Sequence, residues 1–178
     1  MYIQEGFIGD QDELKQLTDK ENWSYQFQSQ TMWYEGWWKR EPENVWESLV
    51  RKIWEPLEVD QDKTHGFEFW LNVLPTGGFL NWHSDKDEME CNDSGKIVTP
   101  KQGTLYYPVP HEVSGGYLEI QNKHNEIERI APSFNRLIIF DSGLLHRVSP
   151  VYSGPRFVFV TNLWEGHTPK AFLEKKMA

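Results

Sequence analysis

Residues 131–164 read APSFNRLIIFDSGLLHRVSPVYSGPRFVFVTNLW. Two segments of this stretch, 135–141 and 156–164, are rich in β-branched and aromatic residues, and the tripeptide Ser-Gly-Pro at 153–155 comes directly before the second. β-Branched and aromatic residues favour extended structure, whereas glycine and proline favour turns. We therefore expect two strands here, with a reversal of the chain between them.

The same pattern extends toward the N-terminus. Three more segments favour extended structure, 67–75, 103–109 and 115–121, and Pro-Thr-Gly-Gly at 75–78 is a turn signal. Few helical patterns separate these segments. An antiparallel sandwich or barrel is therefore favoured over a parallel sheet with crossover helices.

The first third of the chain has helical patterns. Asp10 and Glu13 have the spacing of a capping box that opens a short helix. Pro42 suits the first position of a second helix, and Pro56 ends or kinks it. The apolar face of this helix follows the i, i+3, i+4, i+7 rhythm through Trp46, Leu49, Val50, Ile53 and Leu57.

A chain of 178 residues suits one domain with a hydrophobic core. We expect a mainly β (α+β) fold in which residues 1–58 form a helical support, residues 66–164 form the β core, and residues 165–178 form a C-terminal tail. The acidic segment 84–96 is expected to be a solvated or lid-forming loop.

The composition restricts the possible partners. The formal net charge of −9 argues against broad binding to nucleic acid or to an anionic membrane, because both need a basic surface. Cys91 is the only cysteine, so no internal disulfide can form and a reducing compartment is the simpler assumption. The N-terminus lacks the pattern of a signal peptide, and no run approaches the ~18 apolar residues of a membrane span. We expect a cytoplasmic protein, and the sequence makes no prediction of its oligomeric state.

The segment NWHSDKDE, residues 81–88, contains a histidine and an aspartate two positions apart. On a strand, residues i and i+2 point to the same face, so His83 and Asp85 could bind one metal ion. His146 offers a third ligand, and two histidines with one carboxylate are typical of non-haem Fe(II) oxygenases. In the alternative interpretation Asp85 begins an ordinary turn and His146 is a packed or surface histidine.

Arg156 follows His146 by ten positions, after a turn that would bring it back toward the same cavity. An arginine offers a planar, permanently charged fork to a carboxylate. A buried arginine needs such a partner, because an unpaired internal charge is costly. The partner is either a bound carboxylate or one of the chain's own acids.

This order of motifs over residues 68–164 resembles the Fe(II)/2-oxoglutarate-dependent dioxygenase superfamily. With YYPVPHEVSGGYLEI (106–120), the stretch 131–164 is similar to the prolyl-hydroxylase-like branch, and NVLPTGGFLNWHSDKDE (72–88) is similar to the base-dealkylating branch. The resemblance implies a double-stranded β-helix, or jelly roll, braced by N-terminal helices. It also implies Fe(II), 2-oxoglutarate as co-substrate, and O2.

The resemblance implies a role for particular residues. His83, Asp85 and His146 would bind the iron, and Arg156 would bind the distal carboxylate of 2-oxoglutarate. Further co-substrate contacts would come from Asn72 and Tyr107, although packing within the sheet is the alternative for both. The sequence departs from both branches at Leu74, where each usually has a tyrosine.

The implied reaction is hydroxylation of a C–H bond, with release of succinate and CO2. Halogenases of the superfamily lack the carboxylate ligand, so Asp85 favours hydroxylation. Trp70, Trp82 and Asn162 are candidates to line the substrate side of the cavity. The substrate would be a small molecule or a peptide, with nucleic acid not expected.

Two alternatives stay open. An oxidative dealkylase of a modified base has the same fold, but the acidic charge and the segment VTNLW (160–164), where that branch carries a second arginine, disfavour it. A non-enzymatic jelly-roll module would instead use tryptophans to bind a sugar or a peptide.

Overall fold

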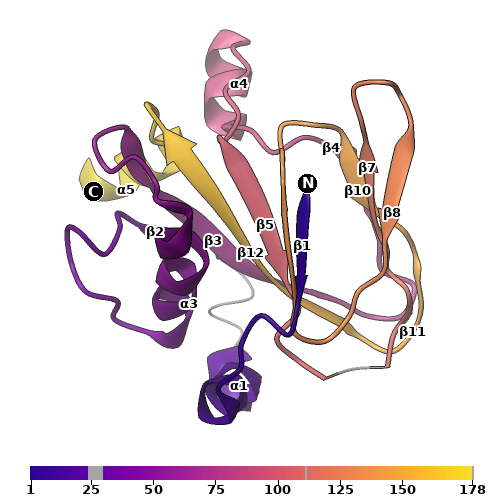
Figure 1. Ribbon diagram of the computed structural model, residues 1–178. Helices are drawn as coiled ribbons and strands as arrows, with labels where there is room; N and C mark the ends of the chain where they lie inside the picture. Colours follow the sequence, from indigo (N-terminus) through magenta and orange to yellow (C-terminus); the bar gives the residue numbers. More distant parts are fainter. Residues whose placement is uncertain (24–29, 111, 178) are drawn as a thin grey trace.

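A computed structural model of the protein describes residues 1–23, 30–110 and 112–177, and two antiparallel β-sheets form its centre (Figure 1). The larger sheet has the order β1-β9-β5-β12-β3-β2, with strands β1 (Tyr2–Glu5), β2 (Met32–Tyr34), β3 (Thr64–Leu74), β5 (Gln102–Tyr106), β9 (Arg136–Phe140) and β12 (Arg156–Glu165). The smaller sheet has the order β4-β10-β7-β8, with strands β4 (Leu80–His83), β7 (Leu118–Gln121), β8 (Ile127–Ile130) and β10 (His146–Val148). A short pair joins β6 (Ser114–Gly115) to β11 (Val151–Ser153). The mainly β architecture agrees with the sequence prediction.

Strands β3 and β12 are the longest and pair with each other over their whole length, from Arg156 opposite Leu74 to Glu165 opposite Thr64. Successive side chains of a strand point to opposite faces of the sheet. One face of this pair, the outer face, therefore meets the helices, and the other, the inner face, meets the smaller sheet.

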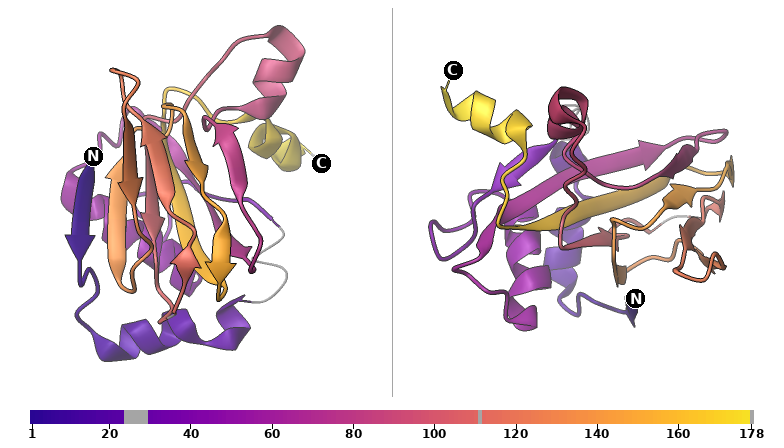
Figure 2. Two further views of the ribbon diagram at one scale, coloured as in Figure 1. Left: turned by 90° about the vertical axis from the view of Figure 1, so that its right-hand side faces the viewer. Right: turned by 90° about the horizontal axis from the view of Figure 1, so that it is seen from above.

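The outer face is covered by α1 (Gln11–Thr18), η1 (Lys20–Trp23), α3 (Val45–Trp54) and η2 (Glu55–Leu57). Figure 2 shows α3 on the side of the larger sheet that is opposite the smaller sheet. The predicted apolar stripe of α3 is correct for Trp46, Leu49, Val50 and Ile53, all of which are buried. These side chains join Phe67, Phe69, Leu71 and Phe159 of β3 and β12 in one hydrophobic core.

Three details of the helical layer differ from the prediction. Helix α3 begins after Asn44, whose side-chain oxygen accepts the N–H groups of Trp46 and Glu47, so Pro42 lies before the helix. Leu57 lies in η2 and is 45% exposed, because the helix ends before the apolar stripe reaches it. Asp10 does cap α1, but Glu13 forms an ion pair with Lys52 of α3 rather than completing a capping box.

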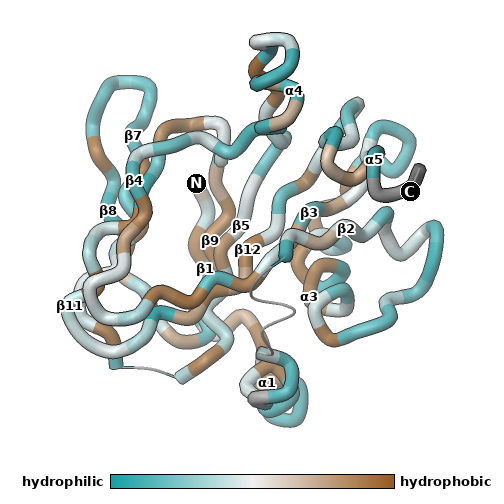
Figure 3. The backbone as a smooth tube through the Cα atoms, turned by 180° about the vertical axis from the view of Figure 1, so that it is seen from behind, coloured by the Kyte–Doolittle hydropathy of each residue, from teal (hydrophilic) through white to brown (hydrophobic). Residues whose placement is uncertain are grey.

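A second hydrophobic core lies between the two sheets. It contains buried residues of both, among them Leu105, Ile138 and Val158 from the larger sheet and Leu118 and Ile120 from the smaller sheet. In Figure 3 the hydrophobic residues gather along the central strands, whereas the β7–β8 connection is mostly hydrophilic. The middle of the inner face is thus apolar, and the polar residues on this face are exceptions in an apolar layer.

The acidic segment 84–96 contains helix α4 (Glu88–Ser94), which packs near α5 (Lys170–Met177). Asp87 caps α4 and also accepts hydrogen bonds from the backbone N–H of Lys170 and from His167, at 2.9 and 2.8 Å. Asp87 is only 3% exposed, so the expectation of a solvated or lid-forming loop is wrong at this residue. Its carboxylate ties the starts of two helices together.

Within the described part of the chain, no helix has both the length and the apolar character that a membrane span requires.

Candidate metal centre

His83, Asp85 and His146, called the triad below, come together at one edge of the space between the sheets. His83 ends β4, His146 begins β10, and the two residues are paired in register with ring centroids 4.3 Å apart. Asp85 Oδ1 lies 3.8 Å from Nε2 of each histidine. One ligand atom of each residue lies within 4.8 Å of the others, and the described residues contain no other such cluster of His, Cys, Asp and Glu.

Asp85 reaches this position from a loop, because β4 ends at His83. The premise that both residues share one face of a strand is therefore wrong, although the two side chains do converge. The backbone N–H of Asp85 donates to the carbonyl of Ser142 at 2.9 Å, and this contact fixes the loop against the turn that precedes His146.

Local contacts orient the histidine rings. Nδ1 of His83 lies 2.7 Å from the carbonyl oxygen of Asn81, and Nδ1 of His146 lies 2.9 Å from that of Leu144. A carbonyl only accepts, so each Nδ1 carries the proton and each Nε2 offers its lone pair toward the centre of the triad. Burial lowers the pKa of His146, which favours the neutral form that binds metals.

Asn162, on β12, holds the other oxygen of the aspartate. Its Nδ2 donates to Asp85 Oδ2 at 3.0 Å, and its Oδ1 lies 3.4 Å from the hydroxyl of Ser142. Gly103 leaves room for this side chain, since a Cβ there would lie 2.6 Å from Asn162 Oδ1. The sequence placed Asn162 at the substrate side and gave no sign of its contact with Asp85, because that contact depends on long-range pairing.

Arg156 is completely buried at the first position of β12. Its Nε donates to the carbonyl of Gly116 at 2.9 Å and its Nη2 donates to the hydroxyl of Tyr107 at 3.0 Å. Its Nη1 is buried and has no hydrogen-bond partner among the described residues. No Asp or Glu of those residues forms an ion pair with it, so the alternative of an internal acid partner has no support there.

A hollow joins Arg156 to the triad, and we call it the inner hollow. Its walls include Trp70 and Asn72 of β3 and Val158 and Asn162 of β12. Asn72 Oδ1 is buried without a hydrogen-bond partner in the described structure. Orphaned polar atoms at Arg156 and Asn72 in one hollow indicate a site that a polar ligand would complete.

Three residues singled out from the sequence remain: Tyr107, Leu74 and Trp82. Tyr107 is buried and contacts Arg156, whereas Leu74 is the register partner of Arg156 across the β3–β12 pair. Trp82 lies outside the hollow: it is 37% exposed, and the guanidinium carbon of Arg147 lies 4.8 Å from its ring centroid. An irregularity in the β4–β10 pairing accounts for this, because such a bulge turns Trp82 away from the face that carries Leu80 and His83.

Glu68 is a further residue near the triad that sequence reasoning missed. It lies on β3 opposite Asn162, and its Oε2 accepts a hydrogen bond from Trp164 Nε1 at 3.1 Å. A glutamate within a strand of aromatic residues gives no signal by itself. Only the pairing of β3 with β12 places Glu68 near the triad, opposite Asn162.

Comparison with known proteins adds a family match. A model of the 2OG-Fe(II) oxygenase superfamily matches residues 69–164. A PKHD-type hydroxylase of Pseudomonas fluorescens is 26% identical over 113 residues, which cover 62% of this chain and 50% of that protein. One from Hyphomonas neptunium is 37% identical over 84 residues, covering 47% and 37%. The chain thus spans about half the length, or less, of these curated relatives.

Solved structures share the fold. A prolyl-4-hydroxylase of Pseudomonas putida aligns with a TM-score of 0.66 at 19% identity, covering 94% of this chain and 87% of that one. A viral collagen prolyl hydroxylase of Paramecium Bursaria Chlorella virus-1, in complex with 2OG, gives 0.62 at 18% identity, covering 94% and 96%. A prolyl hydroxylase of Trichoplax adhaerens, in complex with a peptide fragment of hypoxia inducible factor, gives 0.58 at 18% identity, covering 92% and 83%. With the strand topology, these likenesses confirm the predicted jelly roll.

Proposed function

The chain belongs to the 2OG-Fe(II) oxygenase superfamily, and from this premise we propose that it is an Fe(II)- and 2-oxoglutarate-dependent hydroxylase. The family uses Fe(II), 2-oxoglutarate and O2, and the curated relatives are named PKHD-type hydroxylases. We propose that the triad binds the iron. Two neutral imidazoles and one carboxylate are the donor set that suits this metal and leave positions open for other ligands.

The observation that carries the proposal is the orphaned Nη1 of Arg156 in the hollow that contains the triad. A buried guanidinium whose fork is incomplete has a place for one carboxylate. The distal carboxylate of 2-oxoglutarate supplies that group, and its other end would then face the triad along the inner hollow. Tyr107 and the carbonyl of Gly116 hold the guanidinium in place for this contact.

Each residue has a distinct task in this proposal. The carbonyls of Asn81 and Leu144 fix the tautomers of the two histidines, and Asn162 binds one oxygen of Asp85 so that the other remains directed at the metal. The apolar walls, among them Val158 and Phe140, exclude water from the co-substrate. The iron and its co-substrate supply the oxidising chemistry, with succinate and CO2 as products.

The tryptophans argue against a binding module as the function. A module that binds a sugar or a peptide through tryptophans needs their rings on the surface. Four of the nine tryptophans are instead buried and four are partly buried, and the exposed ring of Trp82 is covered by the guanidinium of Arg147. For the substrate we propose a small molecule or a peptide, and the cytoplasmic location stays a prediction.

Metal binding tests the proposal directly. Calorimetry with Fe(II) under argon should give one ion per chain for the parent and no measurable binding for His83→Ala. His124→Ala is the matched control, because His124 is exposed in the β7–β8 connection. Equal iron affinity in His83→Ala and the parent would contradict the assignment of the triad.

A further inference from the structure

A second hollow also lies on the inner face of the larger sheet, and we call it the outer hollow. It meets the inner hollow at the triad. It has a volume of about 170 Å³ and is lined by Glu68, Trp70, Lys86 and Glu88. Trp70, Asn162, His83 and Asp85 line both hollows. His83 and Asp85 of the triad therefore lie between two spaces, and each space has its own polar residues.

The two hollows end in opposite charges. Arg156 and Asn162 are six positions apart on the inner face of β12, which is about 20 Å along a strand at about 3.3 Å per residue. Asn162 is paired in register with Glu68 of β3, so Arg156 and Glu68 mark opposite ends of the cavity. A cation ends the inner hollow, and a carboxyl group faces the outer hollow.

Glu68 has hydrogen bonds but no ion-pair partner. Its carboxyl group accepts a hydrogen bond from the indole N–H of Trp164 and lies beside Asn162, its register partner on β12. No nitrogen of a described Lys, Arg or His lies within 4.0 Å of its oxygens. Glu68 is partly buried, and this desolvation, with a smaller contribution from the charge of Asp85, raises its pKa to about 7. A cation placed beside the carboxylate would relieve this cost of burial.

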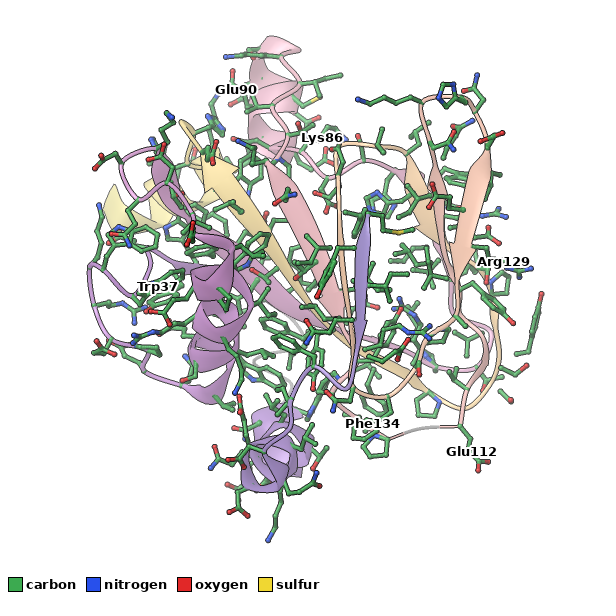
Figure 4. All side chains as sticks on the ribbon, viewed as in Figure 1. Trp37, Lys86, Glu90, Glu112, Arg129 and Phe134 are labelled. Atoms are coloured by element: carbon green, nitrogen blue, oxygen red, sulfur yellow. The ribbon has the colours of Figure 1, made fainter. Side chains whose placement is uncertain are left out.

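The other charged groups of the outer hollow are a Lys–Glu pair and Asp85, which is assigned to the metal. Lys86 Nζ donates to Glu88 at 2.8 Å, so these two form an ion pair at the rim, and Figure 4 shows Lys86 below α4. Asp85 faces the two histidines of the triad and accepts a hydrogen bond from Asn162, and the proposed iron would balance its charge. Glu68 is thus the carboxyl group of this hollow that is left without a balancing charge among the described residues.

We propose that the outer hollow binds a positively charged group of the substrate, an alkylammonium or a guanidinium, between the carboxylate of Glu68 and the indole of Trp70. A carboxylate forms charge-assisted hydrogen bonds with such a group, and tryptophan is the best aromatic partner for a cation. The opposite charges at the two ends keep the anionic co-substrate and the cationic substrate in separate hollows. This inference rests on the proposed function, since it names the substrate class of the same site.

Two pairs of probes test the inference. n-Butylammonium is compared with 1-butanol, and N-acetyl-L-arginine amide is compared with N-acetyl-L-citrulline amide, so that each cation has a neutral partner of similar shape. Binding is measured by ligand-observed NMR on the 178-residue chain loaded with Zn(II), a redox-inert substitute, and 2-oxoglutarate. At least one cation should bind the parent about tenfold more tightly than its partner, as one charge-assisted contact predicts. The stronger of the two cations distinguishes a small amine from a peptide side chain as the source.

The variant Glu68→Gln keeps the shape of the side chain and removes its charge, so the preference should fall to about threefold or less. Glu128→Gln, at an exposed position of β8, is the matched control and should keep the full preference.

A separate titration with 2-oxoglutarate in parent and variant distinguishes failure of the cation site from failure of the proposed function. If 2-oxoglutarate binds but neither cation binds the parent more tightly than its neutral partner, the cation site is refuted and the proposed function stands. A full preference in folded Glu68→Gln would also refute the site, whereas a cation preference without 2-oxoglutarate binding would refute the function alone.

Discussion

On the outer face of β12, Phe157 packs edge-to-face against Trp23 and Phe159 stacks on Trp46, with ring centroids 5.2 and 5.4 Å apart. On the inner face of the same strand, Arg156 and Asn162 direct polar atoms toward the hollows at the triad. The outer face is apolar and closely packed. The inner face has a buried guanidinium with one nitrogen, Nη1, that has no hydrogen-bond partner among the described residues.

This difference separates stability from function along one strand. Burial of aromatic rings on the outer face stabilises the fold. A buried charge with an incomplete set of partners does the reverse, because its desolvation is not fully offset. Substitutions of polar residues on the inner face should therefore change ligand affinity. Substitutions on the outer face should change the free energy of unfolding.

The largest effect is expected on the outer face. Phe159→Ala should lower the free energy of unfolding by about 3–5 kcal/mol, since it removes a ring that is fully buried between Trp46 and Phe69. Val160→Ala, the next residue on the inner face, should cost less because fewer atoms are removed. Urea denaturation of both variants measures the difference. A smaller loss for Phe159→Ala than for Val160→Ala would break the distinction between the faces.

A smaller effect, on binding rather than on stability, is expected for Asn162→Ala. Loss of the hydrogen bond to Asp85 Oδ2 frees the carboxylate to turn, so the affinity for Fe(II) should fall by about 10- to 100-fold. Thr161→Val is the matched control on the outer face, where the Thr161 hydroxyl lies 3.4 Å from Trp54 Nε1. Calorimetry should show unchanged iron affinity in Thr161→Val. An equal loss in both variants would mean that Asn162 acts through general stability.

A pH-dependent effect on stability is expected for Glu68. Its pKa is raised from 4.5 to about 7 in the fold, so the folded metal-free protein binds this proton more tightly than the unfolded chain does. The contribution of Glu68 to stability is therefore fully present below pH 4.5 and is lost as the pH rises through about 7. The free energy of unfolding of Glu68→Gln, minus that of the parent, should increase between pH 5 and pH 8. A flat difference would show that the carboxyl group is well solvated.

Much of the fold was predictable because its longest elements carry strong local patterns. The segments 156–164 and 135–141 became β12 (Arg156–Glu165) and β9 (Arg136–Phe140) with small shifts at their ends. Strands of three or four residues, such as β8 and β10, carry too few residues for a pattern and form through their partners. Helix α4 was missed because none of its residues is buried, so it has no apolar stripe, although Asp87 caps its start and Gly95 its end.

The site was partly predictable for the same reason. Residue type and order pointed to the triad and to Arg156, and the fold brings all four to one cavity. Trp82 was misplaced because the irregularity in the β4–β10 pairing has no sequence signature. The roles of Asn162 and Glu68 depend on which residues face each other across β3 and β12, and strand register is set by the whole sheet.

The central claim is that the guanidinium of Arg156, whose Nη1 has no partner among the described residues, binds 2-oxoglutarate. A titration of metal-loaded protein with 2-oxoglutarate tests this claim most directly. Arg156→Ala should weaken binding by about 10- to 100-fold, because a charge-assisted contact contributes about 1.5–3 kcal/mol. Arg156→Lys should restore only part of the affinity, since an ammonium cannot reproduce the fork. Metal affinity should stay unchanged in both variants. Indistinguishable 2-oxoglutarate affinities in the parent and the two variants would contradict the account.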